Sequence, residues 1–458
     1  MRSRIVVATC LAALLAAGAA LAGGTVEEVT FYSNALGEER AALVYLPEGY
    51  DASDASYPVL YLIPGHAGTA GNWYSFPEFT SALDQMIGDG SIEPFIFVEP
   101  DASCMPWAPA VPYPFPSYLT DSELTGNHEA GMVQDLVGWI DTTYMTLDDR
   151  EYRYIVGRSA GGYGAARVAL RHPDVFGGLG LQAGMTALEP VQYFIPMLLA
   201  EYPEGPPYDF NPFAGGASFM VFSWSAAFTP NLSNPPWYVD LMVDSEGSFD
   251  TEVWNRFVSE SPTQLAAEMA ASGGQLDIYM DSGDQDLYQP FTTVFSMVLN
   301  ALEIPHTFEI YDGDHETPPM WERLRIHVTY FMPMPATAES TTFVFNPRRK
   351  WPTQEFLIEL PGSLEADLID FDTIAITEIE GVPLEAPLEP IGTYEISDLN
   401  GNGLTDLTVR FAAQPLANAI GVAGVDPPSK VRLTLRGKTV DQLFWEGVAT
   451  LFVPTLGK

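Results

Sequence analysis

The chain has 458 residues, more than one ordinary domain holds, and its length agrees with two or three domains. Hydrophobic residues make up 47% of it, so we expect large packed cores. Only 20 Lys and Arg face 60 Asp and Glu, which gives a formal net charge of -40. Such a surface repels polyanions, which excludes nucleic acid and anionic membranes as partners.

The first 22 residues predict a secretory signal peptide. Arg2 and Arg4 precede an apolar run, and Ala20-Leu21-Ala22 supplies the small residues of a cleavage site. A membrane anchor is the alternative, but the segment is short for a span and ends in small residues. We therefore expect a secreted, periplasmic or cell-surface protein without a membrane span after signal removal. Cleavage would leave Cys104 as the only cysteine, so no internal disulfide is expected.

Residues 23–335 predict an α/β domain, because short apolar runs alternate with helical segments. We expect a helix at Ala160–Arg171, which ends before Pro173. The expected strands are Val26–Phe31, Ala41–Leu46, Val59–Ile63, Phe95–Val98, Tyr152–Val156, Gly178–Leu181, Leu276–Met280 and Thr307–Tyr311. This pattern predicts a mostly parallel sheet with helices on both faces, whose ligands bind at the carboxyl ends of the strands.

Residues 187–260 interrupt this rhythm and read as an insertion rich in Pro and aromatic residues. Its aromatic residues include Tyr193, Phe194, Phe210, Phe213, Trp224, Trp237 and Trp254. Such an insertion often covers an active site and forms a substrate pocket. Ordinary packing of a helical subdomain is the alternative for each aromatic residue.

The composition changes again near residues 333–342, and the helical pattern disappears. Residues 338–458 predict an accessory domain built as an antiparallel β-sandwich. Its expected strands are Phe343–Phe345, Glu355–Leu360, Thr373–Ile376, Leu407–Phe411 and Val431–Leu435.

A serine motif marks the candidate nucleophile. Gly157–Gly161 reads G-x-S-x-G, with Ser159 at its centre, between the strand Tyr152–Val156 and the helix Ala160–Arg171. That order is what a nucleophile elbow requires, since glycines permit the sharp turn and the helix start favours developing negative charge. A tight structural turn is the alternative interpretation.

A serine hydroxyl needs a base to accept its proton, and the chain has six histidines. His315 follows the last expected strand, Thr307–Tyr311, and precedes a helix around Trp321. A histidine in the loop after the final strand is the arrangement that this architecture uses. We therefore predict His315 as the base.

The base needs a carboxylate that orients its ring, and three acids follow the penultimate strand. Asp281, Asp284 and Asp286 all lie within a few residues of its end, and their spacing leaves the choice open. Any of them completes the order Ser, Asp, His along the chain, which is the α/β-hydrolase order.

Two backbone N–H groups must bind the oxyanion of the tetrahedral intermediate. The first should belong to Ala160, directly after the nucleophile, and the second to the turn after Val59–Ile63. Within that turn we predict the main chain of His66 as the donor.

At these residues the chain resembles the putative-esterase family of α/β-hydrolases, which includes feruloyl and acetylxylan esterases, S-formylglutathione hydrolases and mycolyltransferases. The resemblance spans about residues 30–333 and is most specific in YRYIVGRSAGGYGAARVALRHPDVFGGLGLQAG. VLYLIPGHAGTAGNW is similar to the family's oxyanion turn, and Glu129 and WIDTTYMTLDDR also fit. The family's acid sits in a G-x-x-D turn, which Gly283–Asp286 matches, so the resemblance implies Asp286 as the acid. Pro64, Arg158 and Ala160 depart from the family's common residues, so the acyl specificity of relatives is not implied.

Residues 398–406 read D-x-N-x-N-G-x-x-D, a spacing that suits calcium. The predicted ligands are Asp398, Asn400, Asn402, Leu404 and Asp406, and the alternative is an Asx-rich turn between strands. Val409 stands where an EF-hand has Glu, so this loop differs from an EF-hand.

The leading functional hypothesis is a secreted serine esterase that cleaves carboxylic esters, either on acylated polysaccharide or on small acyl esters, without a catalytic cofactor. Acyl transfer to an alcohol or sugar is the second hypothesis, because it uses the same residues. A secreted binding protein without catalysis is the third.

Overall fold

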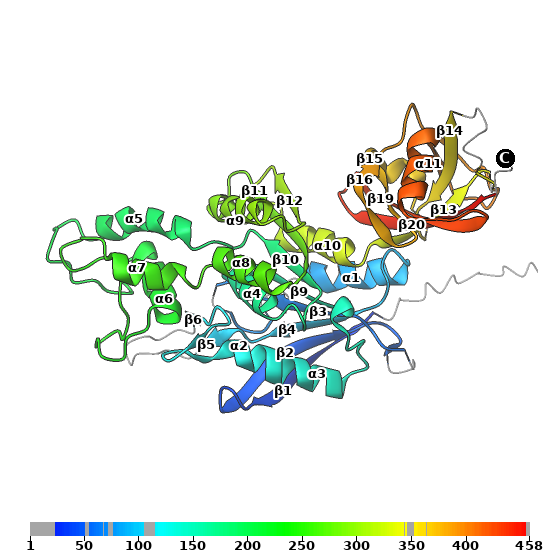
Figure 1. Cartoon of the computed structure of the whole chain (residues 1–458). Coiled ribbons are helices and arrows are strands. Elements are labelled where there is room, and N and C mark those ends of the chain that lie inside the picture. The colour runs from blue at the N-terminus through cyan, green and yellow to red at the C-terminus, as the bar shows by residue number, and fades with distance from the viewer. Residues whose placement is uncertain are drawn as a thin grey trace, which may run out of the picture.

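A computed structural model describes residues 23–50, 55–66, 68–71, 77–104, 115–342, 344–345, 352–362 and 364–454. The predicted signal peptide, residues 1–22, lies outside the described residues. The described chain forms two eight-stranded sheets, each with its own helices, and two small two-stranded sheets (Figure 1). Within these ranges, no helix combines the length and the apolar character that crossing a membrane needs.

The first sheet has eight strands in the order β1-β2-β4-β3-β9-β10-β11-β12. Their bounds are β1 Thr25–Ser33, β2 Glu38–Leu46, β3 Val59–Ile63, β4 Ile96–Pro100, β9 Arg153–Arg158, β10 Gly178–Gln182, β11 Asp277–Gly283 and β12 Thr307–Tyr311. β1 pairs with β2, and β2 with β4, in antiparallel fashion, and the remaining neighbours are parallel. The predicted fold class, a mostly parallel α/β-hydrolase sheet, is confirmed.

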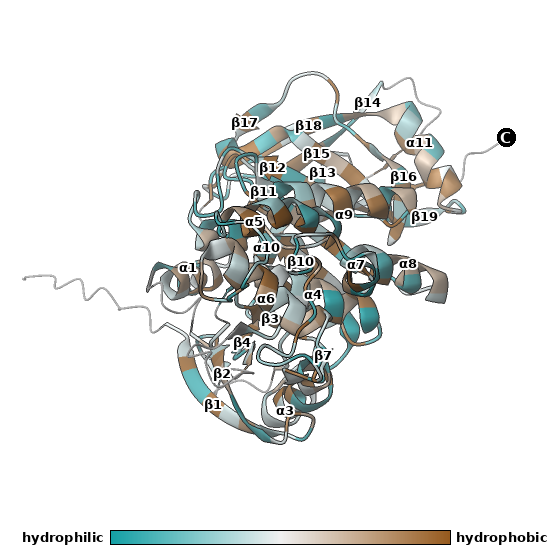
Figure 2. Cartoon of the chain, turned by 90° about the vertical axis from the view of Figure 1, so that its left-hand side faces the viewer, coloured by the Kyte–Doolittle hydropathy of each residue, from teal (hydrophilic) through white to brown (hydrophobic). Residues whose placement is uncertain are grey.

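Helices cover both faces of this sheet, because its central strands are apolar on both sides. Every residue of β3, β4 and β10 is buried. The helices α1 (Pro77–Gly88) and α10 (Met320–Phe331) pack on one face. The other face carries α3 (Val137–Thr143), α4 (Ala160–Arg171), α8 (Pro262–Ser272) and α9 (Gln289–Ala301). Figure 2 shows the contrasting edge strand β1, on which hydrophilic and hydrophobic residues alternate.

Shorter elements connect these layers before the elbow. They are β5 Ser103–Cys104, β6 Phe115–Pro116, β7 Asp121–Ser122, β8 Gly126–Asn127, α2 His128–Ala130, η2 Gly131–Leu136 and η3 Arg150–Tyr152. Cys104 is buried and forms no disulfide within the described part of the chain.

The predicted insertion leaves the sheet after β10 and forms a helical lobe at one end of the molecule (Figure 1). It contains η4 (Glu189–Phe194), α5 (Ile195–Ala200), α6 (Gly216–Phe228) and α7 (Thr251–Val258). Most of its buried apolar residues form a cluster with Ala160 and Tyr163 of α4, and Phe222, Ala226 and Val239 form a second, smaller cluster. The lobe is therefore packed directly against the start of the elbow helix.

The second sheet begins at β13, immediately after α10, and has the order β16-β15-β19-β20-β13-β14-β18-β17. The bounds are β13 Met334–Ser340, β14 Thr353–Glu359, β15 Ile369–Ile379, β16 Val382–Leu388, β17 Glu395–Ser397, β18 Asp406–Ala412, β19 Ser429–Thr439 and β20 Phe444–Val453, with η5 at Ala366–Leu368. Its neighbours pair antiparallel except β13 and β20, which are parallel. The expected strand at Phe343–Phe345 is reduced, in its described residues, to one bridge between Val344 and Phe452.

One expectation for this part of the chain was wrong, because it contains a helix, α11 (Ala413–Val422). Leu416 and Ile420, four residues apart, are its buried positions. A single pair at that spacing covers little more than one helical turn. The periodic signal was therefore too short to distinguish a helix from a loop.

The second sheet packs on the first domain through α10. The Phe444 N–H donates to Thr329 Oγ1 over 3.1 Å, and Lys438 forms an ion pair with Glu309. One continuous apolar cluster joins Leu324 of α10 to Trp445 of β20. The two parts therefore share a hydrophobic interface.

Candidate active site

Ser159 occupies a strained turn between β9 and α4. Its φ of 55° and ψ of -122° lie where residues other than glycine are rare, at a cost of about 1–3 kcal/mol. The flanking glycines are required because backbone carbonyl groups lie too close to leave room for a Cβ. A Cβ on Gly157 would overlap the carbonyl of Gly161, and one on Gly161 would overlap the carbonyl oxygens of Ile63 and Pro64. Gly157 is therefore explained by the tightness of the turn itself, and Gly161 by packing against the end of β3.

The serine lies at the start of α4, where helix geometry leaves backbone donors without partners. Ala160 is the first residue of α4, and such an N–H has no intrahelical acceptor. The helix dipole adds partial positive charge at the same end. Ser159 and Ala160 are both largely buried. An oxyanion at this position would be stabilised by both features.

His315 and Asp286 lie together at the carboxyl edge of the same sheet. His315 Nδ1 lies 2.9 Å from Asp286 Oδ2, and the Asp286 side chain has no solvent exposure. The other carboxylate oxygen, Oδ1, accepts the Tyr288 N–H over 2.7 Å. Both oxygens are thus engaged, which holds the carboxylate fixed against the imidazole.

The two competing acids have other partners. Asp281 accepts two hydrogen bonds from the Arg323 guanidinium and lies 3.2 Å from His327 Nε2, inside the core. Asp284 is exposed and accepts the Gly313 N–H. Of the three acids, only Asp286 is hydrogen-bonded to His315 in the described residues.

Two residues that sequence reasoning missed connect Ser159 to His315. Arg158 donates a hydrogen bond to the carbonyl oxygen of His315 and lies 3.3 Å from the carboxylate of Glu316. The Tyr288 ring lies 5.2 Å from the His315 ring, measured between centroids. Burial, followed by the charge of Asp286, raises the pKa of Tyr288 to about 12, while an interaction with the Ser159 side chain acts in the opposite direction. Tyr288 therefore lies beside all three candidate residues.

The predicted second oxyanion donor, His66, lies in the turn after β3 and follows Gly65, which is next to the serine. A Cβ on Gly65 would be 3.5 Å from the Ser159 Cβ. His66 is exposed, and its ring makes an edge contact with Phe219 of α6, with centroids 4.9 Å apart. The turn is therefore beside the elbow, and oxyanion binding by the His66 N–H stays a prediction.

The remaining histidines have structural partners. His128 binds the Thr125 carbonyl, His172 the Glu129 carboxylate, His306 the Ser296 hydroxyl and His327 the Asp281 carboxylate. Glu129 also forms a buried ion pair with Arg167 of α4 over 2.7 Å. Glu129 thus ties α2 to the elbow helix.

In the predicted calcium loop, backbone N–H groups donate hydrogen bonds to the carboxylates. Asp398 accepts from the N–H groups of Gly401 and Gly403, and Asp406 accepts from those of Leu399 and Asn400. The residues that the structure describes include no group of three or more His, Cys, Asp or Glu arranged to hold a metal ion. These contacts are those of Asx turns, so calcium binding stays a prediction.

The sheet order and the strand–serine–helix turn define an α/β-hydrolase fold. The chain belongs to the family described as "Putative esterase", whose model matches residues 33–324. It is 32% identical over 169 residues to an endo-1,4-beta-xylanase/feruloyl esterase of Xylanibacter ruminicola, a match covering 36% of this chain and 22% of that protein. It is 29% identical over 158 residues to esterase Rv1288 of Mycobacterium tuberculosis, covering 34% of this chain and 32% of that protein.

The match therefore spans at most about a third of the length of these curated relatives. A solved ferulic acid esterase superposes with a TM-score of 0.50 at 20% identity, and the superposition covers 68% of this chain and 98% of that one. At this identity the likeness shows the shared fold.

Proposed function

We propose that the protein hydrolyses carboxylic esters through an acyl-enzyme. Ser159 is the nucleophile, His315 the general base and acid, and Asp286 the carboxylate that orients His315. The N–H groups of Ala160 and His66 bind the oxyanion. Membership of an esterase family agrees with this reaction class.

The observation that carries the proposal is the 2.9 Å hydrogen bond between Asp286 and His315 Nδ1, beside the strained elbow of Ser159. A carboxylate on Nδ1 keeps that nitrogen protonated, which leaves Nε2 as the proton acceptor. The Arg158 side chain supports the same geometry, because it holds the His315 backbone from the residue next to the nucleophile.

In the proposed reaction, Ser159 Oγ attacks the ester carbonyl while His315 accepts the hydroxyl proton. The tetrahedral oxyanion collapses, the C–O bond to the alcohol breaks, and His315 returns the proton to the departing oxygen. Water then attacks the acyl-serine with His315 again as base. The bond between the acyl carbon and Ser159 Oγ breaks, the carboxylic acid leaves, and His315 returns the proton to Oγ. Each oxyanion donor typically contributes about 2.7–4 kcal/mol to stabilisation of the transition state.

We further propose that the esters are carried by polysaccharide outside the cell. The xylanase/feruloyl esterase relative supports this substrate class through its name. The signal-peptide pattern of residues 1–22 supports export.

A panel of 4-nitrophenyl acyl esters and methyl ferulate, hydrolysed by the wild type and by Ser159→Ala, tests the proposal. We expect wild-type turnover and a loss of at least about a thousandfold in the variant. Equal turnover by both proteins would contradict it. An added acceptor alcohol separates hydrolysis from acyl transfer, because transfer converts the acyl group into a new ester.

A further inference from the structure

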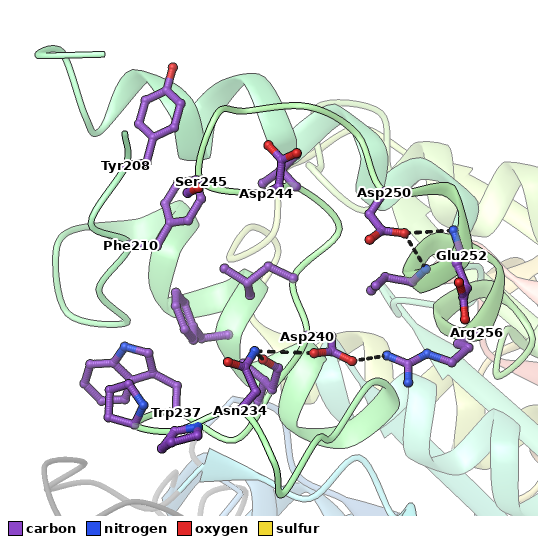
Figure 3. Close-up of a pocket in the computed structure, with 17 residues that line it drawn as sticks. Tyr208, Phe210, Asn234, Trp237, Asp240, Asp244, Ser245, Asp250, Glu252 and Arg256 are labelled. Atoms are coloured by element: carbon purple, nitrogen blue, oxygen red, sulfur yellow. Dashed lines mark hydrogen bonds and ion pairs between the residues drawn. The ribbon is translucent and has the colours of Figure 1, made fainter. Parts of the chain in front are cut away.

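The helical insertion contains a cavity of ≈ 580 Å³ that the reaction above does not use (Figure 3). Its wall is built from the loop around Tyr208, from α6, from residues 234–245 and from the start of α7. A cavity of this size lies within the range of small-molecule binding sites. Aromatic residues line one side of it, and polar side chains face them across the opening.

The aromatic side is rigid. The rings of Tyr208 and Phe210 are stacked at an interplanar angle of 11°, with centroids 5.2 Å apart. Tyr202 supports Phe210 from behind with an edge contact at 5.1 Å, and Trp237 packs against Phe222 at 5.9 Å. Flat, fixed aromatic faces are surfaces on which an apolar ring face can stack at small entropic cost.

The polar side offers groups with unused hydrogen-bonding capacity. The Arg256 guanidinium binds Asp240 through one N–H group over 2.6 Å. Its other N–H groups donate to none of the residues that the structure describes. Among the same residues, the carboxylate of Glu252 forms no hydrogen bond, and neither does the hydroxyl of Tyr208 on the aromatic side. The Arg256 N–H groups and the Glu252 carboxylate thus stand opposite the stacked rings.

The charge of the cavity excludes anionic ligands. Asp240, Asp244, Asp250 and Glu252 line it, and Arg256 is the one cationic side chain among its lining residues. Because Asp240 already neutralises Arg256, the remaining field is negative and repels carboxylates and phosphates. The cavity thus combines aromatic rings, groups that can hydrogen-bond to ligand hydroxyls, and a negative field. Together these features suit a ligand with a neutral, hydroxyl-rich ring.

The helix α6 connects this cavity to the candidate active site. Phe222 lines the cavity, and Phe219, three residues earlier, contacts the His66 ring. Three residues of an α-helix rise by about 4.5 Å, so the two features lie within one helical turn along α6. A chain-like ligand in the cavity would therefore extend beside the oxyanion turn.

We propose that this cavity is a carbohydrate-binding subsite, which holds a neutral oligosaccharide segment of an acylated polysaccharide. The link to ester cleavage rests on the function proposed above, whereas binding of the sugar itself does not. The sugar ring stacks on Tyr208, Phe210 and Trp237, and its hydroxyls bind Glu252 and Arg256.

Isothermal titration of the full chain carrying Ser159→Ala with xylohexaose tests the proposal, with hexagalacturonate as the anionic counterpart. We expect xylohexaose to bind and hexagalacturonate not to bind. Adding Trp237→Ala should weaken xylohexaose binding by about tenfold or more. Tyr208→Phe, which keeps the ring and removes only the hydroxyl, should weaken it by a smaller factor. The matched control is Tyr193→Ala, an exposed aromatic of the same insertion outside the cavity, which should leave binding unchanged.

Urea unfolding of Trp237→Ala, followed by circular dichroism, checks that the fold is intact, and we expect a cooperative transition. If xylohexaose does not bind, binds all variants equally, or binds more weakly than hexagalacturonate, the subsite proposal is wrong. These results are separate from the test of the reaction. Retained turnover by Ser159→Ala would contradict the assignment of the nucleophile, but it would not change the result of the binding experiment.

Discussion

The Asp286 carboxylate lies 2.9 Å from His315 Nδ1 and is completely screened from solvent, whereas the His315 side chain is 26% exposed. The carboxylate is thus buried behind the imidazole, and the ring has one open side. Replacing Asp286 with Asn should free the imidazole to adopt the wrong tautomer. We expect kcat for 4-nitrophenyl acetate to fall by about 10⁴-fold, with the fold intact.

The matched control for that variant is Asp284→Asn, which changes an exposed acid two residues away. Its activity should stay within about twofold of the wild type, because a surface acid contributes little to this geometry. Steady-state kinetics of both variants decides between the two acids. A larger loss in Asp284→Asn than in Asp286→Asn would contradict the assignment.

Arg158 is expected to position His315 through its main chain. Arg158→Met removes the hydrogen bond to the His315 carbonyl and retains much of the side-chain volume. We expect kcat to fall by about tenfold, which corresponds to 1.4 kcal/mol, while KM changes little. Glu316→Gln is the control, because this carboxylate is 78% exposed and its ion pair with Arg158 should contribute at most about 1 kcal/mol. Equal kcat values for Arg158→Met and the wild type would contradict the proposal that Arg158 positions His315.

Much of the fold followed from the sequence where a strand-like or helical run stops at turn residues. The strands Val59–Ile63 and Thr307–Tyr311 and the helix Ala160–Arg171 have the bounds that the sequence predicted. Val59–Ile63 is apolar throughout and stops at Pro64, and the helix stops before Pro173, so local residues set both limits. α11 was missed because its buried stripe has two residues.

The candidate site was less accessible to sequence reasoning. Spacing alone left Asp281, Asp284 and Asp286 as equal candidates for the acid. Asp281 is distinguished by its hydrogen bond from Arg323, a residue far along the chain. Arg158 stands at the variable position of its motif, and the sequence marked it only as a departure from the family's common residue, without a role. The sequence did not single out Tyr288, since its contact with His315 exists only in the folded chain.

Close packing at the elbow predicts opposite effects of two glycine substitutions. Gly161→Ala should destabilise the protein by about 1–3 kcal/mol or more and reduce activity, because its Cβ would collide with the end of β3. Gly138→Ala, within α3, meets nothing within 4 Å and should stabilise by about 0.5–1 kcal/mol. Urea unfolding of both variants measures the difference. Similar stabilities would show that the elbow tolerates a side chain.

The Asp281–Arg323 pair predicts a pH-dependent stability. Burial raises the pKa of Asp281, but His327 and Arg323 outweigh it and hold that pKa below the ordinary 3.8. The pair therefore contributes stability that is fully present above pH 3.8 and lost as the pH falls through the lowered pKa. At neutral pH, Asp281→Asn should cost about 3–5 kcal/mol, because it leaves a buried guanidinium unpaired.

Unfolding free energies measured from pH 7 to pH 3 check this account of Asp281. The difference between Asp281→Asn and the wild type should shrink only toward the acid end of that range. Glu322→Gln, an exposed acid next to Arg323, is the control and should change stability by no more than about 1 kcal/mol at any pH. A difference that is constant with pH would contradict the proposed ion pair.

The central claim is that Ser159 is the nucleophile, and labelling with a fluorophosphonate followed by peptide mass spectrometry tests it most directly. We predict one adduct, on the peptide that contains Ser159, formed in step with the loss of esterase activity and absent from Ser159→Ala. An adduct on another serine, or complete inactivation without modification of Ser159, would contradict the account.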